Sequence, residues 1–294
     1  MISINTFSIV ARDPASGDLG VAVASKFLAV GAVVPFAKAG IGAVATQSYA
    51  NTSYGPRALA MFAAGASPDL VAQALAKSDP GIASRQFGLV DASGRSATYT
   101  GDDCHPWAGG KSGENYAAQG NLLTGPEVVD ALVKAFLQNT ELSFPERLLA
   151  ALLAGDRIGG DKRGRQSAAL LVVGENKGYA GFNDRWIDLR VDDHEDPVPE
   201  LKRLLKIHRS LFNPAQDARP INKSEIGWLQ SATAKLGFYE GPINGVWNDG
   251  LEKALWAWLG LENLEERYQG GPFLEETILK KLHNKFSIFS KKSP

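Results

Sequence analysis

The sequence is poor in cysteine, methionine and net charge. It has one cysteine and two methionines, and a single thiol excludes an internal disulfide and a zinc site built from several cysteines. The 31 Lys and Arg residues nearly balance the 32 Asp and Glu residues, so no strong net field draws the protein onto nucleic acid or an anionic membrane. The sequence therefore predicts no nucleic-acid partner and no membrane partner.

Long apolar runs are also absent. No stretch reaches the roughly 20 apolar residues that cross a bilayer, and the first ten residues lack the basic start and apolar core of a signal peptide. We therefore expect a cytoplasmic protein. A chain of 294 residues that is 44% hydrophobic and 21% charged has ordinary globular composition and favours two domains.

Short β-favouring runs alternate with pairs of helical stretches. Strand character covers residues 6–11, 19–25, 41–45, 86–91, 96–100, 167–173 and 186–191. Helical apolar spacing covers residues 57–64, 69–77, 127–138 and 145–153, and a polar helix covers residues 200–212. Hairpins beside blocks of two helices favour an α+β fold, with two antiparallel sheets covered by helices, over a doubly wound parallel sheet.

Several sequence blocks carry a resemblance to a known family. They are TFSIVARDP at 6–14, residues 19–26 and 29–32, GAVATQ at 42–47, QGN at 119–121, GGDKRGRQSAAL at 159–170 and DLRVDDH at 188–194. Together they resemble the bacterial family catalogued as domain of unknown function 1028, which is placed among N-terminal-nucleophile (Ntn) hydrolase-like proteins. The resemblance implies a four-layer αββα sandwich and no known substrate.

The first strand is also similar to that of a proteasome β-subunit, where a threonine opens the strand and a lysine follows further along. Thr6 and Lys38 have this relation here. A threonine hydroxyl needs a base to take its proton, and in Ntn enzymes the threonine's own free α-amine, with a pKa of about 8, is that base. The resemblance thus implies Thr6 as nucleophile, with Lys38 lowering the pKa of its hydroxyl and amine.

A structural role for Thr6 stays open. Its nitrogen is an amide until the Asn5–Thr6 bond is cut, and an uncut Thr6 is only a strand residue. Lys38 is either a cleft residue or a surface lysine whose stem covers apolar surface. The pattern Arg-Asp-x-x-Ser of the proteasome-like enzymes is matched by Arg163 and Ser167, but Gly164 stands where the aspartate is expected.

Further polar residues are candidates for binding a substrate. The Gln47 amide is placed to hold a developing oxyanion. Ser48 and Asn51 follow a strand of small residues, where polar groups line a site or make turn hydrogen bonds. Lys26 also follows a strand, and lies either in the sheet cleft or on the surface.

The segment 159–165 is rich in glycine and cations. It lacks the residue order of a P-loop, so nucleotide binding is not expected. Arg163 either grips a carboxylate or phosphate or belongs to a loop that only turns the chain. The family blocks add Asn121, Asp161 and Ser167 to the predicted substrate-binding residues.

Two motifs invite a metal-site interpretation. Residues 102–105 read Asp-Asp-Cys-His, but adjacent Cys and His side chains do not readily face each other, so we expect a loop without catalytic role. The acidic run 192–196 is expected to precede a helix opening at Pro197, because acids near a helix N-terminus favour its dipole. We predict neither a metal nor a cofactor.

Residues 225–282 resemble the peptidoglycan-binding domain family. The resemblance is carried by Leu-Gln at 229–230, by LGFYEGPINGVW at 236–247 and by an apolar helix that includes Ala254, Leu255 and Trp258. In that family the module holds cell-wall glycopeptide near an enzyme, which makes glycopeptide a candidate partner. An adapted role in packing, dimerisation or substrate gating is the alternative.

These observations predict an Ntn-hydrolase-like domain at 1–212, a linker at 213–221, a helical peptidoglycan-binding-like domain at 222–285 and a tail at 286–294. The leading hypothesis is an amidohydrolase that acts on a small amide or peptide-like bond. The alternatives are a catalytically silent scaffold or small-ligand binder and a cell-wall-binding accessory protein. A homo-oligomer, most simply a homodimer, is the default expectation.

Overall fold

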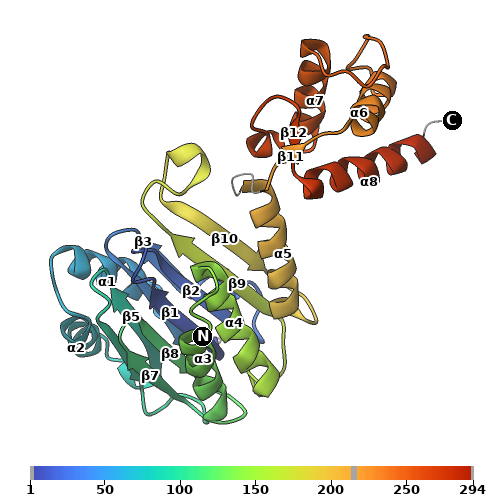
Figure 1. Cartoon of the computed structure of the whole chain (residues 1–294). Coiled ribbons are helices and arrows are strands. Elements are labelled where there is room, and N and C mark those ends of the chain that lie inside the picture. The colour runs from blue at the N-terminus through green and yellow to red at the C-terminus, as the bar shows by residue number, and fades with distance from the viewer. Residues whose placement is uncertain (1–2, 213–216, 293–294) are drawn as a thin grey trace. The chain divides into compact units, whose positions relative to one another are not determined.

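The computed structural model describes residues 3–212 and 217–292 (Figure 1). Its contacts divide the chain into two compact units, Met1–Leu205 and Lys206–Pro294, and the boundary falls inside helix α5 (Pro197–Phe212). Part of the predicted linker, residues 213–216, and the end of the predicted tail, residues 293–294, lie outside the described residues.

The larger sheet of the first unit has six strands in the order β10-β9-β2-β1-β8-β7, and all neighbours are antiparallel. The strands are β1 (Thr6–Arg12), β2 (Leu19–Ser25), β7 (Gly109–Gly113), β8 (Tyr116–Gly120), β9 (Ser167–Val173) and β10 (Arg185–Val191). The predicted runs 19–25 and 167–173 are found with the same bounds.

The smaller sheet has four antiparallel strands in chain order, β3-β4-β5-β6. They are β3 (Pro35–Lys38), β4 (Gly42–Ser48), β5 (Arg85–Asp91) and β6 (Ser96–Thr100). Short 3-10 turns occur at Val30–Ala32, Ile82–Ser84, Tyr179–Gly181 and, in the second unit, Glu265–Arg267.

Helices cover the outer face of each sheet (Figure 1). Helices α1 (Tyr54–Ala63) and α2 (Pro68–Ser78) pack on the smaller sheet. Helices α3 (Glu127–Gln138) and α4 (Phe144–Ile158) pack on the larger one, together with the first part of α5 through Val198, Leu201 and Leu205. The side chains of β1 alternate between layers: Phe7 and Ile9 lie under α3 and α4, whereas Val10 lies between the sheets. The first unit is thus a four-layer αββα sandwich, which confirms the predicted fold class.

The second unit is mainly helical. It contains β11 (Arg219–Pro220), α6 (Lys223–Lys235), α7 (Asp249–Leu261), β12 (Phe273–Leu274) and α8 (Glu276–Lys292). The buried Gln230 side chain holds the loop between α6 and α7, because its Oε1 accepts from the N–H groups of Asn244 and Gly245, both at 2.9 Å. Gln230 of the Leu-Gln motif therefore fixes this loop by hydrogen bonds from the inside of the unit.

Within the described residues of the first unit, three strands are missing from the sequence prediction: β3, β7 and β8. The β7 sequence Gly-Gly-Lys-Ser-Gly has no apolar residue, and β8 carries Gln119 between small residues, so neither shows the period of an amphipathic strand. Their place in the sheets comes from pairing, since β3 pairs with β4, β8 pairs with β1, and β7 pairs with β8. No helix in the described part of the chain is both long enough and apolar enough to cross a membrane.

Candidate functional site

Three hydroxyl residues form a row across the end of the larger sheet. Thr6 of β1 pairs with Ser25 of β2, and Ser25 pairs with Ser167 of β9. Residues paired across antiparallel strands share a face, and the neighbouring apolar residues of that face lie between the sheets. The row therefore faces the inside of the sandwich, and none of the three side chains is more than 2% exposed.

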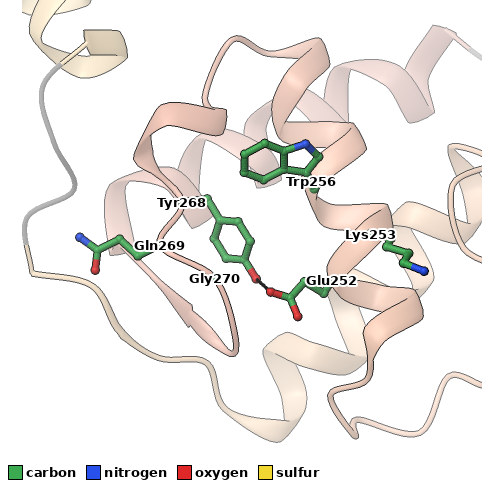
Figure 2. A pocket seen from close by; sticks show the side chains of 6 residues that line it. All are labelled: Glu252, Lys253, Trp256, Tyr268, Gln269 and Gly270. Atoms are coloured by element: carbon green, nitrogen blue, oxygen red, sulfur yellow. Dashed lines mark hydrogen bonds between the residues drawn. The ribbon is translucent and has the colours of Figure 1, made fainter. Parts of the chain in front are cut away.

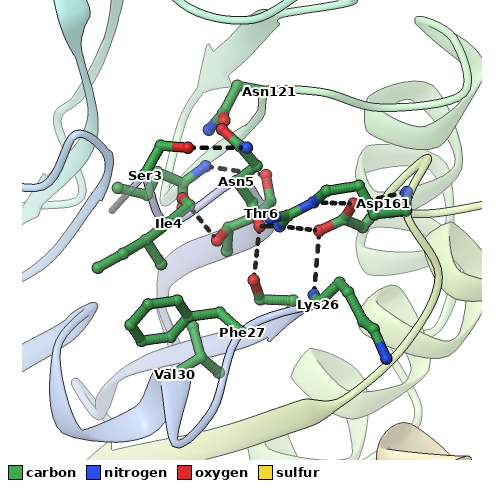
Figure 3. A network of polar contacts seen from close by, with 12 residues as sticks. Ser3, Ile4, Asn5, Thr6, Lys26, Phe27, Val30, Asn121 and Asp161 are labelled. Atoms are coloured by element: carbon green, nitrogen blue, oxygen red, sulfur yellow. Dashed lines mark hydrogen bonds and ion pairs between the residues drawn. The ribbon is translucent and has the colours of Figure 1, made fainter. Parts of the chain in front are cut away.

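The peptide carbonyl between Asn5 and Thr6 accepts two side-chain hydrogen bonds (Figure 3). Ser25 Oγ donates to Asn5 O at 2.5 Å, and Arg163 Nη2 donates to the same oxygen at 3.0 Å. Two donors on one carbonyl oxygen, one of them cationic, draw electron density from its carbon and stabilise negative charge on the oxygen. The Asn5 carbonyl is thus polarised by a hydroxyl and a guanidinium.

Asp161 holds Arg163 in this position. Its buried carboxylate accepts from Arg163 Nε at 3.1 Å and Nη2 at 2.8 Å. It also accepts from the backbone N–H groups of Arg163 at 2.9 Å and Lys26 at 3.0 Å. A bidentate pair with a buried carboxylate fixes the plane of the guanidinium. Asp161 is therefore a positioning residue for Arg163.

Thr6 itself is peptide-linked and 0% exposed. Its Oγ1 donates to Ile4 O at 2.9 Å, and its carbonyl oxygen accepts from Asn121 N at 3.0 Å and Gln47 Nε2 at 3.3 Å. The hydroxyl points back along the chain and lies one residue from the polarised Asn5 carbonyl. In this state Thr6 has no free amine to take its proton.

A network of buried amides lies between the two sheets beside this cluster. The Gln86 side chain, which is 0% exposed, accepts from Gln47 Nε2 and Asn121 Nδ2, each at 2.8 Å. It donates to Gly120 O at 2.8 Å. Gln119 Nε2 donates to Ser8 Oγ at 2.7 Å, and that hydroxyl donates to Gln47 Oε1 at 2.6 Å. Because Gln47 is committed to this network, its amide supports the sheets and does not face a cleft.

The structure corrects the expectation that Lys38 lies beside Thr6. Lys38 is exposed and pairs with Gly42, whereas Ile4 bridges to Ser48. Gly42 and Ser48 are the two ends of β4, about 20 Å apart at about 3.3 Å per residue. The sequence separation of Thr6 and Lys38 therefore does not translate into contact, because β3 places Lys38 at the far end of the sheet.

Asn51 lies in a different cluster. Its Nδ2 donates to Asp79 Oδ2 at 3.0 Å, and its Oδ1 accepts from the Ser53 hydroxyl at 2.7 Å. Asp79 also accepts from Tyr54 and Arg85. Burial alone raises the pKa of Asp79, but these donors outweigh burial and lower it well below its usual range. Asn51 thus has the turn-stabilising role that the sequence left open.

The remaining predicted residues have structural contacts. Ser167 Oγ accepts from Val30 N at 3.1 Å and donates to Phe27 O, so it fixes the turn after β2. Ser48 pairs with Ile4 through its backbone. The Lys26 side chain is exposed and lines an open groove with Arg165, Gln166, Asp193, His194 and Glu195. Within the described chain, no group of three or more His, Cys, Asp or Glu side chains is arranged to hold a metal.

The second unit has an open groove of its own, lined by Glu252, Lys253, Trp256, Tyr268, Gln269 and Gly270 (Figure 2). Trp256 is 52% exposed, and its ring centroid lies 6.2 Å from that of Tyr268. Tyr268 donates to Glu252 Oε1 at 3.1 Å. Burial and the Glu252 carboxylate raise the pKa of Tyr268, so the phenol stays protonated. An exposed indole beside polar groups offers stacking and hydrogen bonds to one ligand.

Sequence reasoning missed Ser25, Asn5 and the aromatic groove. Ser25 ends a predicted strand, and pairing that strand with the first one places Ser25 opposite Thr6 once the hairpin register is known. Asn5 contributes its backbone carbonyl to the site, and a pattern of side chains in the sequence does not indicate the role of a backbone group. Trp256 lies on a helix predicted as apolar, and only the fold shows that its ring is exposed.

Comparisons with known proteins give matches for both units. The model of the family of unknown function DUF1028 matches residues 6–201, and a model described as a putative peptidoglycan binding domain (PG_binding_2) matches residues 211–282. The chain is 31% identical to a DUF1028 protein from Silicibacter pomeroyi, whose crystal structure gives a TM-score of 0.63 and covers 70% of this chain and 89% of that chain. The comparison with curated proteins gives no match.

Proposed function

Because the chain belongs to the family of unknown function DUF1028, its chemistry has to be inferred from the site, and we propose that it is an amidohydrolase of the Ntn type whose nucleophile is Thr6. The observation that carries this proposal is the Asn5 carbonyl, held by Ser25 Oγ and Arg163 Nη2 directly before Thr6. Two donors on a carbonyl that precedes a hydroxyl residue favour acyl transfer to that hydroxyl.

The first step releases Thr6. Its Oγ1 adds to the Asn5 carbonyl carbon through a five-membered ring, and Ser25 and Arg163 stabilise the oxyanion. The carbon–nitrogen bond between Asn5 and Thr6 then breaks, and the hydroxyl proton ends on the departing nitrogen. Water hydrolyses the resulting ester, which leaves a carboxylate on Asn5 and a free amine and hydroxyl on Thr6.

The freed Thr6 then carries both nucleophile and base. Its α-amine, with an ordinary pKa of about 8, takes the hydroxyl proton as Oγ1 attacks an amide substrate. Ser25 and Arg163, no longer bonded to Asn5 O, are available to the oxyanion of that substrate. Lys38 has no part in this chemistry, and Asp161 acts by positioning Arg163.

Intact-mass measurement of the protein from its native host tests the proposal. We expect cleavage between Asn5 and Thr6, followed by hydrolysis of small amides in a screen that uses the cleaved protein. A chain that keeps the Asn5–Thr6 bond during prolonged incubation contradicts the release step. The first unit is then a catalytically silent scaffold or ligand binder.

A second candidate function concerns the second unit, for which we propose binding of cell-wall glycopeptide. It is favoured by the match of residues 211–282 to a peptidoglycan-binding model and by the exposed Trp256 ring in the groove beside Tyr268. Indole rings pack against the apolar faces of ligands, while Glu252, Lys253 and Gln269 offer charges and hydrogen bonds at the groove.

The change Trp256→Ala should weaken sedimentation of the full chain with purified sacculi about tenfold or more, since loss of a binding aromatic costs about 2 kcal/mol. The matched control is Leu261→Ala, a residue 69% exposed on the same helix and outside the groove-lining set. Equal sedimentation of both variants and the natural chain would rule out this groove. No sedimentation of the natural chain would rule out the binding function.

A further inference from the structure

Residues 3–5 lie against the sandwich in the manner of a bound peptide. Ile4 N donates to Ser48 O at 2.6 Å, and Ser48 N donates to Ile4 O at 2.9 Å. This pair is an isolated antiparallel bridge between Ile4, which precedes β1, and Ser48, the last residue of β4. Main-chain bonds of this kind, made by the end of a strand to an extended segment, are the usual means by which proteins bind peptides in β conformation.

The side chain of Ile4 fills an apolar site. It is 6% exposed and belongs to the apolar cluster between the sheets, which includes Val30 and Val34 and against which Phe27 packs. Figure 3 shows the Ile4 side chain on the same side as Phe27 and Val30. Burial of a branched aliphatic side chain supplies much of the affinity of a short segment, so this position is the anchor of residues 3–5.

The next position is polar and enclosed. Asn5 is 3% exposed, its Nδ2 donates to Ser3 Oγ at 3.1 Å, and its carbonyl oxygen is held by Ser25 and Arg163. Asn5 Oδ1 and Asn121 Oδ1 are both buried and have no hydrogen-bond partner among the described residues. The site therefore holds the main chain of Asn5 through Ser25 and Arg163, and encloses its side chain.

We infer that residues 3–5 occupy a peptide-binding site of the first unit. An extended peptide with a branched aliphatic residue followed by a residue of about the size of asparagine binds there once residues 3–5 have left. Peptides of this kind are the substrate class of the proposed hydrolase, and their cleavage rests on the function proposed above. The binding itself requires only the Ser48 main chain, the apolar anchor site, and the donors Ser25 and Arg163.

The test uses the full chain with Ile4→Asp, which places a charge in the apolar site and should displace residues 3–5. Ile4→Val is the matched control, because it keeps the apolar anchor. Both variants also carry Thr6→Ala, so no hydroxyl attack complicates the measurement. Hydrogen exchange at the Ser48 amide reports occupancy, because that N–H is bonded to Ile4 O, and the probe is the peptide acetyl-Ser-Ile-Asn-amide.

We expect the Ser48 amide to exchange at least about tenfold faster in the Ile4→Asp protein. The added peptide should restore its protection, and a peptide with Asp in place of Ile should bind about tenfold more weakly or worse. The inference is overturned if the Ser48 amide stays unprotected at saturating peptide while the amides of β5 remain protected.

If Ile4→Asp unfolds the unit, Ile4→Gly with the same Thr6→Ala background removes the anchor without adding charge, and the same readouts apply. Peptide binding together with an uncut Asn5–Thr6 bond in the natural chain supports the site while contradicting the hydrolase proposal. The peptide-binding site and the hydrolase proposal can therefore be contradicted independently of each other.

Discussion

Replacing Thr6 by alanine should leave the Asn5–Thr6 bond uncut, and replacing Arg163 by methionine should slow its cleavage about 10²- to 10³-fold. The first change removes the attacking oxygen. The second removes one of the two donors to Asn5 O, and loss of one oxyanion donor in other enzymes has an effect of this size. Both rates are measured by intact mass against time, and Thr6→Ser should retain cleavage because it keeps the hydroxyl.

Two control variants distinguish an effect on cleavage of the Asn5–Thr6 bond from an effect on folding. Arg165 lies on the same loop, but its guanidinium bonds Asp156 at 2.8 Å and Asp196 at 2.9 Å, so Arg165→Met should cleave at the natural rate. Arg163→Met leaves Asp161 buried without its cation, which destabilises the fold. The double variant Asp161→Asn with Arg163→Met relieves that charge, and natural-rate cleavage in the double variant would contradict the role of Arg163.

The change Gln86→Leu should lower the free energy of unfolding of the first unit by about 3 kcal/mol or more. Leucine has a similar size but makes none of the hydrogen bonds that join Gln86 to Gln47, Asn121 and Gly120. Each buried polar group left without a partner costs about 1–3 kcal/mol. Because Gln86 lies on the smaller sheet and Gly120 on the larger one, the change also removes a link between the layers.

Calorimetric unfolding measures this effect, and the expected fall in Tm is about 6–12 °C for a unit of this size. The matched control is Thr98→Val, because its Oγ1 makes only long hydrogen bonds, 3.3 Å to Phe87 O and 3.4 Å to Gln119 Oε1. That control should cost less than about 1 kcal/mol. Equal destabilisation by the two changes would show that the amide network does not hold the sheets together.

Most of the fold is predictable from local patterns. The run 19–25 is a strand buried on both faces, and its small and β-branched residues are typical of such a strand. The helix 127–138 is found with the predicted bounds, because its apolar residues recur at helical spacing. The strand β7, with no apolar residue, is not predictable in this way, since its position depends on pairing with β8.

The candidate site is likewise predictable from the sequence only in part. The family blocks bring out Thr6, Asp161 and Arg163, and all three lie in one cluster. They do not reveal Ser25 as a donor, or Asn5 O as the atom that Ser25 and Arg163 share. A contact between a side chain and a main-chain oxygen depends on strand register, and register is a property of the assembled sheet.

The α+β class and the hydroxyl residue at the opening of the first strand are predictable from the sequence, because burial periodicity and family blocks are local properties of the chain. Which polar groups meet depends on the tertiary structure. It placed Lys38 at the far end of β4, joined Arg163 to Asn5 across the larger sheet, and laid Ile4 against Ser48. These contacts are made between segments distant in sequence, and sheet order and register alone bring such segments together.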